Sequence, residues 1–525
     1  IIGMKGRLST KIDASIGLLK NVPESILNKL WKRLGLNSDD NNKIEFIILY
    51  RSSTEEVRKF IEGLNGDFQD LGFNFAIVNV RIENIDEISV SNYIQYIELP
   101  KNLYESDLSA NRASCVPEAV SMYNVSGKGV LVGFIDSGID YTHPAFLDNE
   151  GNTRIEYIYD LSNNGAVYNK QQINEAIKSD DPYSIVPEID DTGHGTYVTG
   201  VACGGGNIPN EYKGIAPDAS IAMVKGARGR WVLSSQIMRG IKFLLDKSKE
   251  LNIPLVINVS LSTNNGAHNG SSLLEQYIRI IANLEKITIV IAAGNEGDAS
   301  HHVGGELQKT QIESFEVASD EDSVVINFYK SILPEVSINI KGPSGLSSGN
   351  IKIQEGYFKG SIGRNRYDIY VSGPKPFELE SEIQITLTPI SSDYLVEGTW
   401  QIKIDVISDY EGRYSLWLPI LEGLNPQTKF LQSNPFNTLG IPATVENIIA
   451  VGSYNPQTNT LSSFSGRGVN INGVIVRPDI AAPGENVSGP SANGGYDRKS
   501  GTSVAAPQVS GICALFAEWG LVKGN

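Results

Sequence analysis

The stretch VLVGFIDSGIDYTHPAF, Val130–Phe146, decides the class of the fold. Its first half is a continuous apolar run that ends at Asp136, and Ser137 and Gly138 follow at once. Such a run is typical of a parallel strand that is covered on both faces. A carboxylate at the carboxyl end of a parallel strand lies where α/β proteins bind their ligands. The stretch therefore predicts both a buried strand and a candidate functional residue, although an Asp that merely ends a strand in a turn fits the same pattern.

Further apolar runs of strand length follow along the chain, and amphipathic stretches of helical length separate them. The runs are SIAMVKG (Ser220–Gly226), LVINVSL (Leu255–Leu261), ITIVIAAG (Ile287–Gly294) and NIIAVGSY (Asn447–Tyr454), with helices expected at Ser234–Ser248, at Ser271–Leu284 and after Ser503. This alternation predicts a doubly wound, mainly parallel α/β sheet of about residues 105–304 and 432–525.

Two other regions have different patterns. Residues 44–104 read as a small βαββαβ unit, in which Ser53 and Glu56 form a helix-capping box. Residues 305–431 contain short alternating strands and turn residues, which predicts an inserted all-β, jelly-roll-like sandwich. Residues 1–43 form an N-terminal extension with one expected amphipathic helix at Pro23–Leu36.

Composition excludes several classes of function. The chain has 525 residues, 41% of them hydrophobic, and carries 44 basic against 60 acidic residues, a net charge of −16. This acidic balance repels phosphates, so neither nucleic acid nor an anionic membrane is an expected partner. No apolar run is long enough to span a membrane, and the first residues lack the apolar segment of a secretory signal. We therefore expect the protein to stay in the cytoplasm where it is made, and its three cysteines fit a reducing compartment.

Two more short motifs can carry chemistry. In DDTGHGTYVTGVACG, His194 lies between two glycines at an expected helix start, where an imidazole can transfer protons near neutral pH. In SGTSVAAPQVSGICALFAEW, Ser503 opens an apolar helix whose exposed N–H groups can stabilise an oxyanion. Taken singly, each residue also fits a structural role, as a capping or core His and an N-capping Ser.

Taken together, the motifs DSG at Asp136, GHGT at His194, AAGNEG at Ala292–Gly297 and GTSVAAP at Ser503 resemble those of the subtilisin-like serine proteases, the subtilases. The resemblance covers about 129–300 and 432–520, with 44–104 as the propeptide that acts as intramolecular chaperone and inhibitor. It implies a serine endopeptidase with the triad Asp136, His194 and Ser503. Asn295 would be the donor of the oxyanion hole.

The same resemblance implies where a substrate binds. The strand Ser260-Leu261-Ser262 would pair with the substrate, and Ala292, Ala293 and Gly294 would help to form the pocket wall. Ser262 stands where many members carry Gly. Val504 and Gln508 replace the usual Met and His of the serine motif, and neither belongs to the triad. The family spacing places autoprocessing near Tyr104-Glu105, and the released propeptide is expected to stay bound.

Three stretches look like the Csp germination proteases of clostridial spores: Ile173–Thr196, the β-insertion and Asn437–Asn455. That resemblance implies a protein zymogen as substrate, spore germination as the role and packaging in the spore. The alternatives are a catalytically silent sensor or regulator of germination, and a general bacterial subtilase outside spores. The β-insertion could also bind carbohydrate through Trp400, Tyr414 and Trp417, although we favour a scaffold or lid.

No cofactor is expected, and no metal ligand set is apparent. Subtilases often bind calcium in the loop that follows the His helix. Here that loop is GGGNIPNEYKGIAP, Gly204–Pro217, which offers few oxygen side chains, so we expect no calcium at that loop and leave calcium elsewhere open.

Overall fold

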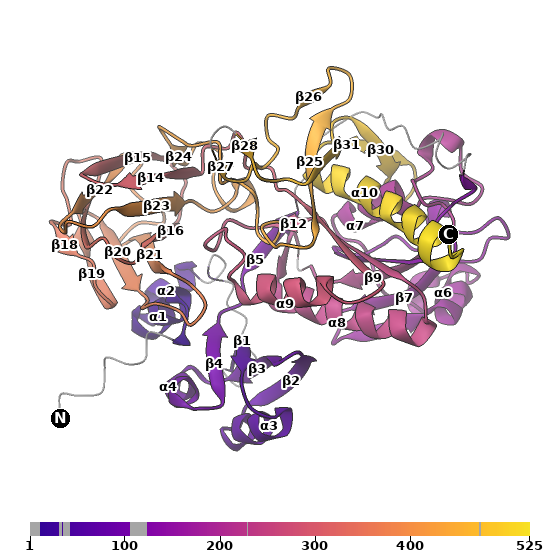
Figure 1. Cartoon of the computed structure of the whole chain (residues 1–525), viewed down its shortest axis with the longest axis horizontal. Coiled ribbons are helices and arrows are strands. Elements are labelled where there is room, and N and C mark those ends of the chain that lie inside the picture. Colours follow the sequence, from indigo (N-terminus) through magenta and orange to yellow (C-terminus); the bar gives the residue numbers. More distant parts are fainter. Residues whose placement is uncertain (1–10, 31–33, 35–42, 106–122, 228, 472–473) are drawn as a thin grey trace. The chain divides into compact units, whose positions relative to one another are not determined.

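A computed structural model of the chain describes residues 11–30, 34, 43–105, 123–227, 229–471 and 474–525 (Figure 1). The chain divides into two compact units, each built from separate segments. The first unit comprises Ile1–Asn102, Asn264–Leu273 and Ala299–Thr438, and the second comprises Leu103–Thr263, Leu274–Asp298 and Leu439–Asn525.

The first unit contains the predicted βαββαβ arrangement. Its strands are β1 (Ile44–Tyr50), β2 (Asp67–Gly72), β3 (Phe75–Val80) and β4 (Ile94–Glu98), and its helices are α3 (Thr54–Gly63) and α4 (Ile85–Val90). The antiparallel sheet has the order β2-β3-β1-β4. The predicted capping box is confirmed, because Ser53 Oγ accepts from Glu56 N–H and the Glu56 carboxylate accepts from Ser53 N–H.

Two helices precede this sheet, where the sequence predicted one. Helix α2 (Glu24–Leu30) lies within the expected span Pro23–Leu36, whose later residues, Leu34 excepted, lie outside the described residues. Helix α1 (Ala14–Asn21) was not predicted, and Asp13 caps it by accepting from Ile16 N–H at 3.0 Å. A Cβ at Gly17 would meet the ring of Tyr370 at 2.2 Å, so this glycine allows α1 to pack on the sheet that carries Tyr370.

The rest of the first unit consists of two antiparallel sheets that share one hydrophobic core. Within residues 302–430, all of which are described, the only helical element is the 3-10 turn Leu421–Gly423. One sheet has the order β14-β23-β16-β21-β20-β19 and the other β18-β17-β22-β15-β24. Phe430 N–H donates to Ser300 O at 2.9 Å, so the two ends of this all-strand span lie together. The bounds are β14 (His302–Leu307), β15 (Gln311–Val317), β16 (Val324–Ser331), β17 (Val336–Lys341), β18 (Ile351–Lys352), β19 (Gly356–Ile362), β20 (Asn365–Val371), β21 (Glu380–Pro389), β22 (Gly398–Val406), β23 (Gly412–Trp417) and β24 (Lys429–Phe430).

The second unit contains the predicted, mainly parallel sheet. Its order is β26-β25-β13-β11-β6-β9-β7-β8, with β29 pairing to β25; the pairs from β25 to β7 are parallel, and β26 and β8 are antiparallel. The strands are β6 (Leu131–Asp136), β7 (Ile155–Asp160), β8 (Ala166–Asn169), β9 (Ser220–Lys225), β11 (Leu255–Val259), β13 (Ile287–Ala292), β25 (Ile449–Asn455), β26 (Thr460–Leu461) and β29 (Ile480–Pro483). All five apolar runs of the sequence analysis form strands of this sheet, namely β6, β9, β11, β13 and β25, and Leu261 at the end of one run belongs to β12.

Helices cover both faces of this sheet, as Figure 1 shows for α8 and α10. Val132 and Phe134 of β6 share a core cluster with Ala505 of α10. A Cβ at Gly133, between them, would meet Leu244 of α8 at 2.6 Å. Because successive residues of a strand point to opposite faces, α10 and α8 lie on opposite sides. The helices are α6 (Lys170–Ile177), α7 (His194–Cys203), α8 (Ser234–Leu251), α9 (Leu273–Ala282) and α10 (Thr502–Ala517), of which α8 and α9 were predicted within three residues at each end.

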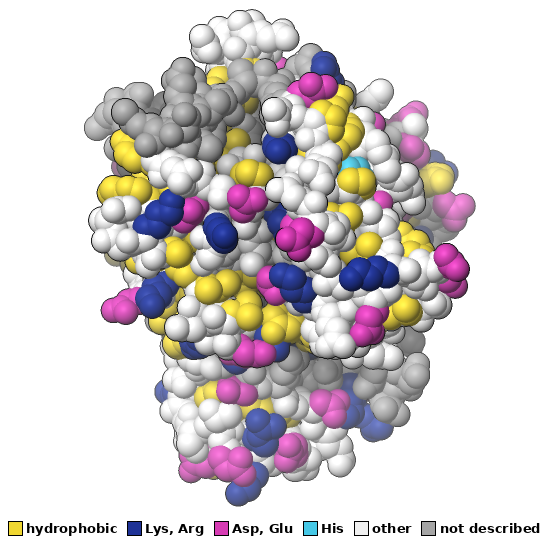
Figure 2. Space-filling view, turned by 90° about the vertical axis from the view of Figure 1, so that its right-hand side faces the viewer, with side chains coloured by type: hydrophobic (Ala, Val, Ile, Leu, Met, Phe, Trp, Pro, Cys, Tyr) yellow, Lys and Arg dark blue, Asp and Glu magenta, His cyan; other side chains and the backbone are white. Residues whose placement is uncertain are grey.

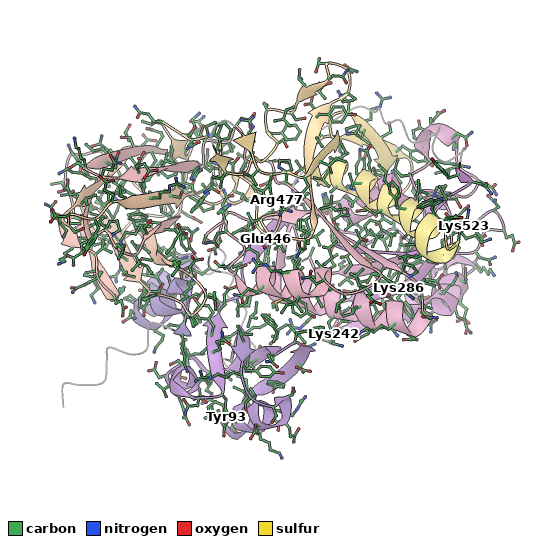
Figure 3. The ribbon with its side chains drawn as sticks, viewed as in Figure 1. Tyr93, Lys242, Lys286, Glu446, Arg477 and Lys523 are labelled. Carbon is green, nitrogen blue, oxygen red and sulfur yellow. The ribbon has the colours of Figure 1, made fainter. Side chains whose placement is uncertain are left out.

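Short strands and turns complete the second unit. A small sheet has the order β10-β5-β12, formed by Trp231–Leu233, Asn102–Glu105 and Leu261–Ser262. Two hairpins are β27 (Asn470–Ile471) with β28 (Val474–Ile475), and β30 (Val487–Pro490) with β31 (Tyr496–Lys499). Arg477, labelled in Figure 3, ties the chain before β25 to β29, because its guanidinium donates to Ile448 O at 3.2 Å and to Asp479 at 2.7 Å.

Surface charge and helix composition bear on possible membrane contact, and one helix departs from the expectation that no segment is long and apolar enough to span a membrane. Figure 2 shows basic and acidic side chains interspersed across the face that it presents. Among the described residues, one helical segment, Thr502–Val522, has the length and apolar composition that a membrane crossing requires. Within the apolar part of this segment, 61% of the residues are buried inside the protein. A core helix has the same composition, and α10 packs against the central strands of the sheet.

Candidate active site

Asp136 and His194 meet at the carboxyl edge of the parallel sheet. Asp136 is the last residue of β6, and His194 is the first residue of α7. The Asp136 Oδ1 atom lies 2.6 Å from His194 Nδ1, and neither side chain is exposed to solvent. A Cβ at Gly195 would lie 2.2 Å from Gly138 O, so only glycine lets α7 approach the end of β6 this closely.

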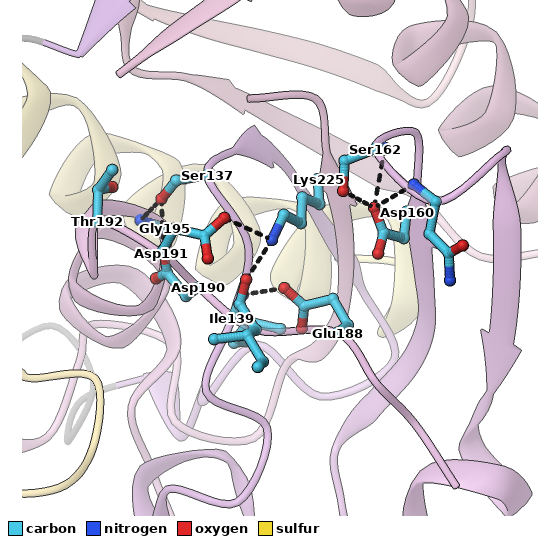
Figure 4. Close-up of polar contacts among 12 residues, drawn as sticks. Ser137, Ile139, Asp160, Ser162, Glu188, Asp190, Asp191, Thr192, Gly195 and Lys225 are labelled. Atoms are coloured by element: carbon cyan, nitrogen blue, oxygen red, sulfur yellow. Dashed lines mark hydrogen bonds and ion pairs between the residues drawn. The ribbon is translucent and has the colours of Figure 1, made fainter. Parts of the chain in front are cut away.

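Asp190, which the sequence analysis did not single out, connects the two elements (Figure 4). Its Oδ1 atom accepts from Ser137 Oγ at 2.7 Å and from Gly193 N–H at 2.9 Å, and its Oδ2 atom accepts from Thr196 N–H at 2.8 Å. Ser137 Oγ in turn accepts from Gly195 N–H at 2.8 Å. The turn after β6 is therefore tied to the first turn of α7. The signal was present in the quoted DDTGHGT motif, since a carboxylate before a helix start is a capping residue.

A second buried acid lies beneath the same turn. Glu188 Oε1 accepts from Ile139 N–H at 3.2 Å (Figure 4), and the side chain is fully buried. Burial raises the pKa of Glu188 well above its usual range, and Lys225 opposes this shift. Lys225 also forms an ion pair with Asp191 at 3.1 Å. These contacts hold the segment that leads into His194 against the sheet.

Ser503 lies in the first turn of α10, and Pro507 shapes its surroundings. Because proline has no N–H, the carbonyl four residues earlier, that of Ser503, lacks its helical donor. The Ser260 hydroxyl supplies one, at 3.1 Å from Ser503 O. Ser260 Oγ accepts from Asn258 Nδ2 at 2.9 Å, which directs its proton to Ser503. Ser260, expected to bind substrate, thus also supports the turn that carries Ser503.

Asn295 follows β13 and is held by the residue before Ser503. Its Oδ1 atom accepts from both the N–H and the hydroxyl of Thr502, each at 3.0 Å. This leaves the Nδ2 amide as the donor end of the side chain, and within the described residues that buried atom has no hydrogen-bond partner. Such a donor has the chemistry needed to stabilise an oxyanion.

The expected pocket residues lie at the end of β13 and on β12. Ala292 ends β13, and the carbonyls of Ala293 and Gly294 accept from Gly440 N–H and Gly466 N–H, both at 2.8 Å. These two carbonyls are thus engaged within the protein. A Cβ at Gly440 would lie 2.7 Å from Ser262 Cβ, so the glycine at 440 makes room for Ser262.

The strand β5 lies between β10 and β12. It pairs antiparallel with β12, Glu105 opposite Leu261 and Tyr104 opposite Ser262, and Glu105 N–H donates to Arg230 O at 3.3 Å. The Glu105 side chain is 2% exposed, and its Oε1 atom accepts from Thr192 Oγ1 at 2.8 Å. Burial raises the pKa of Glu105 to about 7; His194 opposes this shift and Asp136 adds to it. The sequence analysis predicted Glu105 as part of a cleavage site. It did not predict the contact with Thr192, because the two residues are 87 positions apart in the chain.

One group of metal-type ligands occurs among the described residues. Glu105, Asp136 and His194 each have one such atom, and these atoms lie within 4.8 Å of one another. The hydrogen bond between Asp136 and His194 already uses Nδ1 of the imidazole. A metal at this point would compete with that bond, so the geometry suits proton transfer better than metal binding.

Comparison with known proteins gives the following matches. The family model described as "Subtilase family" matches residues 127–388 and 425–520, and the model described as "Csp protease B prodomain" matches residues 10–101. The prodomain match thus includes much of residues 1–43, which the sequence analysis had set apart as an extension. The chain is 23% identical to the PI-type proteinase of Lactococcus lactis subsp. cremoris over 92% of this chain and 27% of that protein. It is also 23% identical to the minor extracellular protease Vpr of Bacillus subtilis, over 75% of this chain and 46% of that protein. The chain therefore spans between a quarter and a half of the length of these relatives.

Among solved structures, the CspB protease of Clostridium perfringens is similar to this chain along most of the length of both. It is 52% identical, with a TM-score of 0.75, and the match covers 79% of this chain and 89% of that chain.

Proposed function

The chain belongs to the subtilase family of serine proteases, and on this premise we propose that it is an endopeptidase with the triad Asp136, His194 and Ser503. The observation that carries the proposal is the 2.6 Å contact between Asp136 Oδ1 and His194 Nδ1, made by two side chains with no exposure to solvent. This contact fixes the tautomer in which Nδ1 holds its proton and Nε2 serves as the base.

The residues then have the following roles. His194 Nε2 takes the proton of the Ser503 hydroxyl as its oxygen attacks the scissile carbonyl, and Asp136 stabilises the imidazolium that forms. His194 returns the proton to the leaving amine, and water hydrolyses the acyl-enzyme by the same steps. Asn295 Nδ2 donates to the oxyanion, and Thr502 holds the amide in the required orientation.

We further propose that the protein processes its own prodomain. The tail strand β5 pairs with β12 as a bound substrate strand would, and Tyr104-Glu105 lies in that pairing. Ser260, which precedes the paired residue Leu261, donates to Ser503 O at 3.1 Å. Glu105 lies opposite Leu261, the neighbour of Ser260 in the chain, so the geometry favours cleavage on the carboxyl side of Glu105. The released prodomain would stay bound as an inhibitor.

A fluorophosphonate probe tests the chemistry directly. Wild-type protein should be labelled, whereas Ser503→Ala should not. Ser463→Ala, which removes an exposed serine of the same unit, should be labelled like the wild type. The absence of label on processed wild-type protein would refute the triad and favour the alternative of a silent sensor or regulator.

For the physiological role we propose the activation of a protein zymogen during spore germination, with the protein packaged in the spore. The prodomain match and the 52% identity to the CspB protease support this proposal. Spores that carry Ser503→Ala should contain the uncleaved zymogen after a germinant is added, while wild-type spores convert it. Conversion in both strains would favour a subtilase that acts outside germination.

We propose that the all-strand span is an inserted sandwich that serves as a scaffold. Trp400 and Trp417 are 0% and 1% exposed, and Tyr414 is 6% exposed. Trp417 stacks on His268 at 4.3 Å between ring centroids. Because these rings are enclosed, they do not form the exposed aromatic ladder that a carbohydrate-binding surface needs, and core packing is the role that their burial supports.

A further inference from the structure

The side chain of Glu105 occupies an enclosed subsite beside the candidate triad. It is 2% exposed, and its carboxyl oxygen lies within 4.8 Å of the nearest ligand-type atoms of Asp136 and His194. Two residues earlier on the same strand, Leu103 is fully buried. Alternate residues of a strand point to the same face, so one face of the tail is enclosed at both positions.

The hydrogen bonds of Thr192 show what this subsite recognises. Thr192 Oγ1 accepts from His194 N–H at 3.3 Å, and it lies 2.8 Å from Glu105 Oε1. Since a hydroxyl has one proton, Thr192 has it available for Glu105 and acts as the donor. The subsite therefore presents a donor to a side-chain oxygen that lies as far from the backbone as that of Glu or Gln.

The charges around Glu105 disfavour an ionised occupant. Asp136 on β6 and Asp190 before α7 raise the pKa of Glu105 in addition to burial, while His194 on α7 and the Thr192 hydroxyl lower it, to a net value of about 7. A neutral oxygen acceptor would accept the Thr192 hydrogen bond without this charge repulsion. Glutamine has the same length as glutamate and is neutral at every pH.

We propose that Thr192 is a specificity-determining residue, which selects substrates with glutamine or protonated glutamate at the position that pairs with Leu261. A buried apolar residue two positions upstream, where Leu103 lies, completes the recognised sequence. This inference rests on the proposed endopeptidase function, because Glu105 reports on substrate binding only if β5 lies in the cleft as a substrate.

Self-processing of the full chain measures this selectivity. Chains with Glu105, Glu105→Gln or Glu105→Ala are synthesised in a cell-free system, and the rate at which each splits into two fragments is followed on denaturing gels. At pH 6 and pH 8 the Glu105→Gln chain should split about tenfold faster than Glu105→Ala, because the alanine leaves the Thr192 hydroxyl without its acceptor.

The ratio of the Gln to the Glu rate should depend on pH. A Glu side chain whose pKa is raised to about 7 in the cleft binds well while it is protonated. Its binding weakens as the pH rises from the pKa of a solvent-exposed glutamate to 7. Between pH 6 and pH 8 the ratio should therefore rise about tenfold. His194 titrates in both chains, so the ratio removes the part of its pH dependence that the two chains share.

Variants of Thr192 separate selection from a merely structural effect. Thr192→Val should reduce the Gln-to-Ala ratio to about two, and Thr192→Ser, which keeps the hydroxyl, should restore it. Thr199→Val is a matched control in α7, because the buried Thr199 hydroxyl has no hydrogen-bond partner among the described residues; it should keep the wild-type ratio.

The outcomes distinguish this inference from the function on which it rests. If Gln, Glu and Ala chains split at equal rates, or if Thr192→Val keeps the wild-type ratio, the subsite is refuted while the protease remains. If no chain splits and fluorophosphonate labels none of them, the proposed function itself fails.

Discussion

Replacing Lys375 by methionine should destabilise the first unit at a buried group of charged side chains. Lys375 Nζ lies 3.1 Å from Glu382 Oε2 on β21, and the two side chains are 7% and 6% exposed. Glu382 Oε2 also accepts from Ala14 N–H at 3.1 Å, at the start of α1, and Glu382 Oε1 accepts from Tyr329 at 2.8 Å. Methionine keeps most of the volume of the side chain and removes its charge.

Several acids depend on this lysine. Burial would raise the pKa of Glu382, but Lys375 and Lys101 outweigh burial and hold it below its usual value. Burial likewise raises the pKa of Glu98 on β4, and Lys101 and Lys375 oppose that shift. Without Lys375, two buried carboxyls would lose a cation that keeps their negative charge tolerable. The loss of stability should therefore affect β4 and β21 together.

The expected magnitude follows from the burial of the pair. Removing one partner of a buried ion pair costs about 3–5 kcal/mol, because the remaining charge loses its compensation. At a tenfold change for every 1.4 kcal/mol, this corresponds to a factor of roughly 10² to 4 × 10³ in the equilibrium for local opening. Exposed ion pairs contribute at most about 1 kcal/mol.

Amide hydrogen exchange measures local opening without requiring the whole chain to unfold in one step. The experiment uses the full chain with Ser503→Ala, so that processing does not complicate the comparison. Peptides that cover Ile94–Glu98 and Glu380–Pro389 should exchange roughly 10² to 4 × 10³ times faster in Lys375→Met.

Two further variants make the test specific. Lys403→Met removes an ion pair with Asp405 at 2.8 Å in which Lys403 is 44% exposed, and it should change exchange less than about fivefold. Adding Glu382→Gln to Lys375→Met should recover much of the lost protection, because the uncompensated carboxylate is gone. Equal protection in Lys375→Met and Lys403→Met would refute the reasoning.

The remaining predictions concern the candidate active site. Ser503→Ala should stay a single chain and lose about 10⁶ in kcat, while wild-type protein runs as two fragments on denaturing gels; peptidase activity in the variant would rule out Ser503 as the nucleophile. Asn295→Ala should lower kcat by about 10²–10³ in a peptide-hydrolysis assay, and wild-type activity would place the oxyanion donor elsewhere. Ser260→Ala removes the hydroxyl that donates to the Ser503 carbonyl, so local opening of α10 in the inhibited enzyme, measured by amide hydrogen exchange, should become easier by about 1–3 kcal/mol; unchanged exchange would refute this role of Ser260.

Much of the fold of this protein is predictable from its sequence, because the patterns that specify it are local. The strand β6 is a continuous apolar run, and the capping box of α3 is complete within four residues. Helix α1 escaped prediction, since its buried face is defined by packing against Tyr370 rather than by a strong pattern of its own. The motifs around Asp136, His194 and Ser503 could be found for the same reason as β6, as each is a short stretch with characteristic neighbours.

Other features depend on tertiary structure alone. Thr192 and Glu105 are 87 positions apart. Lys375 forms its ion pair with Glu382 of β21, and Glu98 of β4 and Asp13, the cap of α1, also lie close enough to stabilise its charge. No local pattern brings such residues together. Whether a carboxyl is ionised, or which way a hydroxyl donates, depends on burial and on partners that only the folded chain supplies. The sequence thus determined which residues this protein has for its chemistry, and the tertiary structure decided their burial, their partners and the direction of their hydrogen bonds.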